Sequence, residues 1–182
     1  LEKLSIRCHR ADLPFMGLDD NKLVDLGVKL PFLKELVLES FVIDPRLFEL
    51  RLPASLLRLS IAAQQNSAVT KANFQCEFPP HLESLTLKVD FDRECMESLR
   101  LPETLKHLEL RVLSSEAPML PQSLRHVNLD FSNAVSSRTF DVDLVLASLP
   151  EKLEFFEFFL PGHPLLDVRI VSRLPRTLTH LG

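Results

Sequence analysis

The sequence has no tryptophan, no tyrosine and only four glycines among its 182 residues. Phosphate-binding loops, nucleophile elbows and zinc-binding helices depend on motifs such as G-x-x-x-x-G-K-[ST], G-x-G-x-x-G, G-x-S-x-G and H-E-x-x-H. None of these motifs occurs here. His9, His81 and His163 have no nearby Ser or Cys that makes a persuasive nucleophile–base pair, and the carboxylates are scattered as single positions. We therefore expect no enzymatic activity, no catalytic residue, no cofactor and no metal.

An excess of basic charge is also absent, since the net charge is −4 and the isoelectric point is near 5.9. Nucleic-acid-binding proteins are normally basic, so we expect no nucleic-acid partner. No apolar run approaches the roughly 18 residues of a membrane-spanning helix, so no membrane partner is expected either. The cysteines Cys8, Cys76 and Cys95 are odd in number and share no metal-ligand spacing. Such a set suits a reducing compartment, which predicts a cytoplasmic protein.

Prolines are plentiful, 13 in all, and most of them open a recurring unit. The copies are LPFLKELVL at Leu30, LPASLLRLSI at Leu52, FPPHLESLTL at Phe78, LPETLKHLEL at Leu101, LPQSLRHVNL at Leu120 and LPEKLEFFEF at Leu149. Each reduces to L-P-x-x-L-x-x-L-x-L, with one residue missing in the Leu30 copy. LEKLSI at Leu1 and LPRTLTHLG at Leu174 are partial copies. We therefore expect residues 1–182 to form one leucine-rich domain of about eight irregular repeats, truncated at both ends.

The spacing of the leucines predicts how each unit folds. The last two leucines of the unit alternate, so both point to the same face of a short strand. One such strand is not stable alone, but strands stacked in parallel pair their backbones and bury their leucines in a shared core. The proline fixes its own φ and keeps the preceding residue extended, which sets the corner into the strand.

With these motifs, the chain resembles the leucine-rich repeat superfamily across nearly its whole length. The first leucines of successive units are 19 to 32 residues apart, centred on the 20–29 residues of that family. The L-P-x-x-L-x-x-L phrase is most similar to the FNIP-type repeats or to divergent fungal F-box proteins. The resemblance implies an α/β repeat solenoid, an arc with a parallel concave sheet. The family's usual Asn or Cys after the strand is replaced here by His9, Phe41, Gln64, Asp90, Leu113, Ser132 and Pro161, which predicts that a polar ladder is absent or partial.

The return segments between the strands predict a convex side of mixed short helix, 3-10 helix and extended chain. We expect helices over Asp19–Leu26, ended by Gly27, over Cys95–Leu99 and over Val142–Ser148, and a strand over Val168–Val171. The most loop-like stretches are Gln64–Lys71 and Ser132–Arg138.

Residues that flank the strand leucines are predicted to project from the concave face, where repeat proteins generally bind partners. The candidate partner-binding residues are Glu35, Glu39, Arg58, Lys88, His107, Glu109, Arg111, His126, Asn128, Asp130, Phe155, Glu157 and Phe159.

Two features of this face have alternative interpretations. His107 and His126 should be neighbours on adjacent strands, either as a solvated or partner-contacting pair or as a metal bridge completed by Glu109 or Asp130. In the run from Phe155 to Leu160, alternation leaves Phe155 and Phe159 outside the core. They are either exposed for binding or covered by an inserted loop or a neighbouring domain.

Three functions are compatible with this pattern. The first is a protein–protein interaction module, in a concrete version the substrate-recognition part of an F-box-type ubiquitin ligase adaptor. The second is a structural scaffold. The third is the repeat region of a pathogen effector with a separate catalytic domain.

Overall fold

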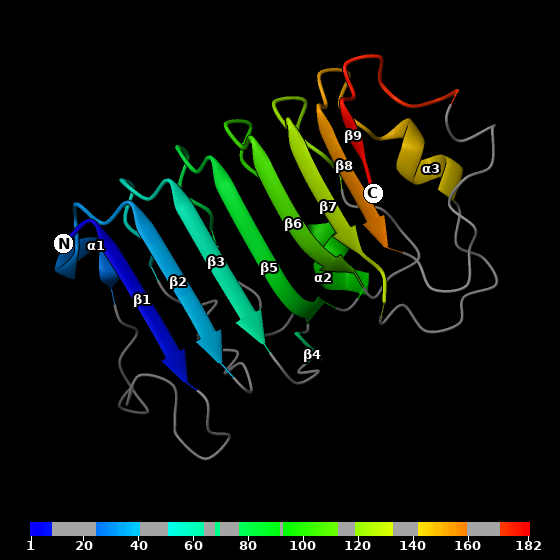
Figure 1. The fold of residues 1–182 in the computed structure, drawn as a ribbon. Helices are drawn as coiled ribbons and strands as arrows, with labels where there is room; N and C mark the ends of the chain where they lie inside the picture. The colour runs from blue at the N-terminus through cyan, green and yellow to red at the C-terminus, as the bar shows by residue number, and fades with distance from the viewer. Residues whose placement is uncertain are drawn as a thin grey trace.

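The computed structural model describes residues 1–8, 25–40, 51–63, 68–69, 77–91, 93–112, 119–132, 142–159 and 172–182. These residues form a single parallel sheet in which the main strands lie side by side in chain order, β1-β2-β3-β5-β6-β7-β8-β9, with β4 paired to β5 (Figure 1). The strands are β1 (Lys3–Cys8), β2 (Glu35–Ser40), β3 (Arg58–Ala63), β4 (Ala68–Val69), β5 (Ser84–Phe91), β6 (His107–Val112), β7 (His126–Asp130), β8 (Phe155–Phe159) and β9 (His180–Leu181).

Each copy of the repeated unit makes the same turn into its strand. In the complete copies the proline carbonyl accepts a hydrogen bond from the amide of the leucine three residues later. For example, the carbonyl of Pro102 accepts from the amide of Leu105 at 3.1 Å. In the shorter Leu30 copy the carbonyl of Leu30 itself accepts from Leu33 at 3.1 Å. Pro31 therefore occupies the second position of that turn, which its fixed φ suits. The missing residue shifts the proline within the turn and leaves the turn intact.

Successive units are joined by a repeated backbone contact just before each strand. Two consecutive amides of one unit donate to a single carbonyl of the preceding unit, as Lys106 and His107 do to Glu83 at 2.8 and 3.0 Å. The same pattern recurs from β1 to β9. It fixes the register of neighbouring strands, so equivalent residues of the units lie side by side, such as Leu85, Leu108 and Val127.

Hydroxyl side chains in the turns add a second link between units. The residue before the first leucine of the unit is Ser55, Thr104, Ser123 or Thr177 in four copies, and its hydroxyl donates to the carbonyl of the corresponding leucine one unit earlier. The distances are 2.7 to 2.9 Å. The polar ladder predicted to be absent or partial after the strands is therefore built before them, from Ser and Thr. These hydroxyls satisfy carbonyls that belong to fully buried leucines.

The core lies on one side of the sheet and contains the leucines that the repeat predicts. The first leucines of the complete units are fully buried, and the two alternating strand positions follow the same rule from β2 to β8. The residue before the proline is partly buried at the margin of this core in most units, as Leu52 and Leu101 are, whereas Leu120 and Leu149 are buried within it. Burial of each large side chain stabilises the fold by about 1.5–3 kcal/mol, so the stack of leucines is its main source of stability.

Short helices pack on the core side of the sheet. They are α1 (Leu26–Lys29), α2 (Arg93–Ser98) and α3 (Val142–Ala147) (Figure 1). Their buried members, including Leu26, Met96 and Val145, belong to the same core as the strand leucines.

The helices α2 and α3 confirm two of the predicted helices, whereas the third prediction was wrong in its boundary. The helix begins after Asp25, whose side chain caps it by accepting from the Val28 amide at 3.0 Å, so Gly27 lies inside α1 and does not end a helix. Residues 19–24 of the predicted helix lie outside the described part of the chain. The loop predicted over Gln64–Lys71 contains the short strand β4. No 3-10 helix is present in the described residues, and the predicted strand over Val168–Val171 and most of the Ser132–Arg138 loop lie outside them.

Candidate functional site

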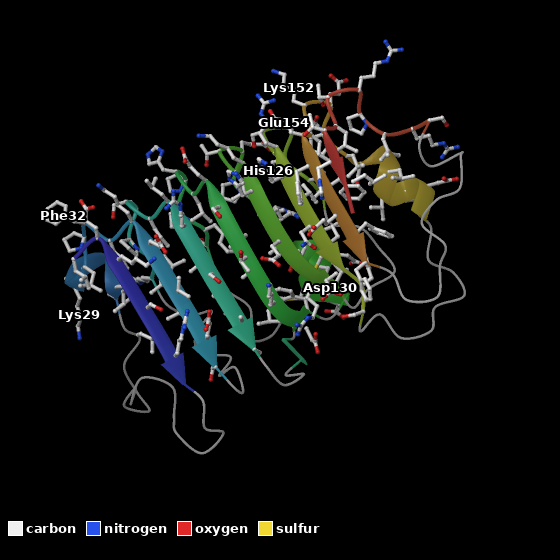
Figure 2. All side chains as sticks on the ribbon, in the orientation of Figure 1. Lys29, Phe32, His126, Asp130, Lys152 and Glu154 are labelled. Atoms are coloured by element: carbon white, nitrogen blue, oxygen red, sulfur yellow. The ribbon has the colours of Figure 1, made fainter. Side chains whose placement is uncertain are left out.

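The face of the sheet opposite the core, which we call the open face, carries the side chains between the buried leucines. The strands β2, β3, β6, β7 and β8 alternate between buried and less buried positions, which confirms the predicted alternation. The strand β5 alternates up to Val89 and then ends in two further buried residues, Asp90 and Phe91. All of the candidate residues lie on this face, from Glu35 in β2 to Phe159 in β8. Figure 2 shows the face from the front, with His126 and Asp130 at the two ends of β7.

Along the strand starts of β6 to β9, four aromatic rings form a row across the open face. His107 and His126 stack with ring centroids 4.5 Å apart and planes 11° apart. Phe155 is tilted against His126 at 5.7 Å and stacks on His180 at 4.4 Å. Phe155 is therefore half-buried between two imidazoles, and its ring is covered by neighbouring strands of the same sheet.

The stacked imidazoles favour the metal-free interpretation of the histidine pair. The lone pairs of an imidazole lie in the ring plane, so two parallel rings do not aim them at one point between the strands. Within the described residues, no group of three His, Cys, Asp or Glu side chains is placed to hold a metal ion. Partial burial lowers the pKa of His107 below its ordinary value, and the nearby His126 lowers it further. The Nδ1 atom of His126 is buried without a hydrogen-bond partner.

On β1 to β3 the open face is a set of paired charges. Glu35 accepts from Lys3 at 2.6 Å and lies 3.6 Å from Arg58, while Arg7 pairs with Glu39 at 3.0 Å. The hydrogen bond from Lys3 is the main cause that lowers the pKa of Glu35. Because each carboxylate here has a close cation, this half of the face has little unbalanced charge.

The middle of the face is distorted by a bulge in β5. Leu87 pairs with Leu110 and Phe91 with Val112, so the β5 strand has extra residues opposite Arg111. The bulge buries Asp90, which is 3% exposed, on the side of Arg111. Arg111 lies between two carboxylates, 3.9 Å from Asp90 and 3.7 Å from Asp130. The Arg111 guanidinium is therefore shared between two carboxylates and lies beyond close hydrogen-bond distance of both.

Next to the bulge, the open face is hollowed over β5 to β8, with Gly182, which follows β9, also in the wall. The hollow has a volume of about 520 Å³, and its walls include Lys88, Glu109, Arg111, Asp130, Glu157 and Phe159. Lys88 is paired with Glu109 at 2.7 Å, and Glu157 accepts from the neutral amide of Asn128 at 2.6 Å. The hollow thus gathers most of the candidate residues of the carboxyl-terminal half, but neither the histidines nor Phe155.

The two phenylalanines with alternative interpretations differ in the structure. Phe156 and Phe158 are buried in the core, as predicted. Phe159 is 57% exposed at the rim of the hollow. Phe155 is half-buried in the aromatic row, where the described residues that cover its ring are His126 and His180. Of these two phenylalanines, Phe159 therefore has the broader exposed apolar surface.

Three residues of this region were missed from the candidate set. Asp90 pairs with Arg111 from inside the bulge, and Ser132 and Gly182 line the hollow. Asp90 and Ser132 stand at the position where leucine-rich repeats carry Asn or Cys, which was a usable signal. Gly182 has no such signal, because its place follows from the pairing of β8 with β9.

Within the described part of the chain, no helix has the length and apolar character needed to cross a membrane.

The geometry of the open face is the basis for assigning a function to it, because no family model, no curated protein and no solved structure matches the chain.

Proposed function

We propose that this chain is a leucine-rich repeat arc that acts as a protein–protein interaction module and binds its partner on the open face. The observation that carries the proposal is a hollow of about 520 Å³ on that face, with the exposed ring of Phe159 at its rim. Exposed aromatic side chains within a charged surface are typical centres of binding energy.

The assignment to leucine-rich repeats is supported by the order and register of the strands. Each copy of the repeated unit supplies one strand, and each strand pairs in parallel with that of the neighbouring copy. The hydroxyls of Ser55, Thr104, Ser123 and Thr177 link the turns as the family's Asn residues would. A stack of this kind buries its leucines on one side and leaves a continuous polar face on the other.

A binding role agrees with the chemistry of the face better than catalysis does. The described carboxylates of the open face are engaged with neighbouring cations, amides or hydroxyls, as in the pairs Glu35–Lys3 and Glu109–Lys88. His107 and His126 stack on each other. We therefore propose that the chain is not an enzyme and that a concrete role is substrate recognition in an F-box-type ubiquitin ligase adaptor. The buried thiol of Cys95 is compatible with a cytoplasmic setting.

Photo-crosslinking from two matched positions tests the proposal. A benzophenone side chain at Phe159 samples the open face, and the same group at Phe32 samples the turn before β2 at the other end of the sheet (Figure 2). Both side chains are well exposed, at 57% and 73%. The expected result in cells is a discrete crosslinked protein from position 159 and none of the same mass from position 32. Identical products from both positions, or none from position 159, would reject the open face as the binding surface.

A further inference from the structure

We propose that the hollow on the open face receives an arginine side chain of the partner protein, held between Asp130, Glu157 and the ring of Phe159. This inference rests on the proposed function and adds to it the chemistry of the partner. The three residues come from neighbouring strands, since Asp130 is the residue opposite Phe159 and Glu157 is opposite Asn128. All three lie in the wall of the same hollow.

The charge of the hollow is unbalanced towards the negative. Its walls carry the carboxylates Glu109, Asp130 and Glu157 and the cations Lys88 and Arg111. Lys88 is bound to Glu109 at 2.7 Å, and Arg111 is shared between Asp130 and the buried Asp90.

Glu157 has no cationic partner within the described part of the chain, because its hydrogen bond is to the neutral Asn128 amide at 2.6 Å. Asp130 accepts the amide hydrogen of Ser132 at 2.8 Å and keeps Arg111 only at 3.7 Å. A cation that entered on the β7–β8 side would pair with both carboxylates without displacing a close ion pair.

The aromatic ring selects arginine among the cations. Phe159 is 57% exposed and, within the described residues, stacks on no other ring. A guanidinium is flat, stacks on aromatic faces and is weakly hydrated, whereas an ammonium is a compact and strongly hydrated point charge. The guanidinium also has five N–H donors in one plane, so it can donate to two carboxylates while it covers the ring.

The test uses nuclear magnetic resonance on the full ¹⁵N-labelled chain with capped amino acids as probes. The probes are N-acetyl-arginine amide, N-acetyl-lysine amide and N-acetyl-citrulline amide, the last of which keeps the flat shape but has no charge. We expect saturable amide shifts in β7 and β8 with the arginine probe, at millimolar concentration. The lysine probe should bind more weakly, and the citrulline probe should bind at least about tenfold more weakly, as for the loss of a charge-assisted hydrogen bond.

Two variants test whether the arginine probe binds in the hollow. E157Q keeps the size of the side chain and its contact with Asn128, and should weaken arginine binding about tenfold. F159A should weaken it severalfold. F32A, which removes a phenylalanine that is even more exposed but lies outside the hollow, is the control and should leave the shifts unchanged.

The inference is wrong if the arginine probe gives no saturable shift, if citrulline binds as well as arginine, or if E157Q and F159A bind the arginine probe like the wild type. Its failure can be told apart from failure of the proposed function. Specific crosslinks from position 159 together with a silent arginine probe would reject only the arginine site. Absence of both would reject the open face as well.

Discussion

The imidazole of His107 stacks on that of His126, with ring centroids 4.5 Å apart and planes 11° apart. The two rings belong to directly paired residues of β6 and β7, so the contact is imposed by the register of the strands. Two imidazolium rings at this distance would repel each other, and each is partly removed from water by the other. The neutral form of His107 is therefore favoured in the folded chain, while the unfolded chain has no such constraint.

This stack predicts that stability falls in mildly acid solution. The pKa of His107 is lowered in the folded state from the ordinary value of 6.5, so the unfolded state takes up the proton first. The unfolding free energy should therefore decrease as the pH falls below 6.5 and level off below the folded-state pKa. Urea unfolding at several pH values between about 7.5 and about 5.5 measures this, in a range above the titration of ordinary carboxyl groups.

Two variants separate the causes of that pH dependence. H107Q should have a flatter profile than the wild type over the same range. H126F keeps a ring in the stack but removes the neighbouring charge, so it should reduce the slope only in part, because burial is the larger cause. A wild-type profile in H107Q would show that the acid sensitivity arises elsewhere.

The hydroxyl ladder predicts a measurable cost for removing one turn hydroxyl. Thr104 donates at 2.9 Å to the carbonyls of Leu82 and Pro80, and Leu82 is fully buried. The isosteric change T104V leaves the Leu82 carbonyl without this donor and should lower the unfolding free energy by about 1–2 kcal/mol. The matched control is T86V on the open face, where the hydroxyl lies 3.5 Å from Glu109. That change should cost less than about 0.5 kcal/mol, and equal costs in the two variants would argue against the ladder.

The alternation in β8 predicts opposite behaviour for two adjacent phenylalanines. Phe158 is 5% exposed and packs against Phe131 at 5.1 Å between centroids, whereas Phe159 is 57% exposed. F158A should destabilise the fold by about 3–5 kcal/mol because it opens a cavity in the core. F159A should change stability by less than about 1 kcal/mol. Denaturant unfolding compares the two, and a larger loss in F159A would mean that the strand is shifted by one residue.

Much of the fold is predictable because the regular spacing of the leucines determines it. The spacing of the leucines predicts both the strands and the face that each residue occupies, and the structure agrees from β2 to β8. The prolines predict the corners, although their exact place in the turn differs in the Leu30 copy. The hydroxyl ladder was visible in the sequence as a Ser or Thr before Leu56, Leu105, Leu124 and Leu178. It was missed because a polar residue was sought after the strand and not before it.

The bulge, the ring stacking and the hollow of the candidate site could not be predicted from the spacing of the leucines. The bulge that buries Asp90 beside Arg111 adds residues to β5 only. The leucines before it, Leu85 and Leu87, keep their regular pairing with Leu108 and Leu110, so the leucine pattern does not reveal the bulge. Stacking of His107 on His126, and of Phe155 on His180, depends on the side-chain rotamers as well as on the register. The hollow follows from the sizes of side chains on several strands together, so no single repeat predicts it.

The central claim, that the open face binds a protein partner, is tested most directly by the affinity of F159A and F32A for the protein crosslinked at position 159. Both variants remove an exposed phenylalanine ring, so they are matched in chemistry and differ in place. The account predicts that F159A raises the dissociation constant about tenfold or more, as for a residue at the centre of an interface, and that F32A leaves it unchanged. An unchanged dissociation constant in F159A, or a larger increase in F32A, would contradict it.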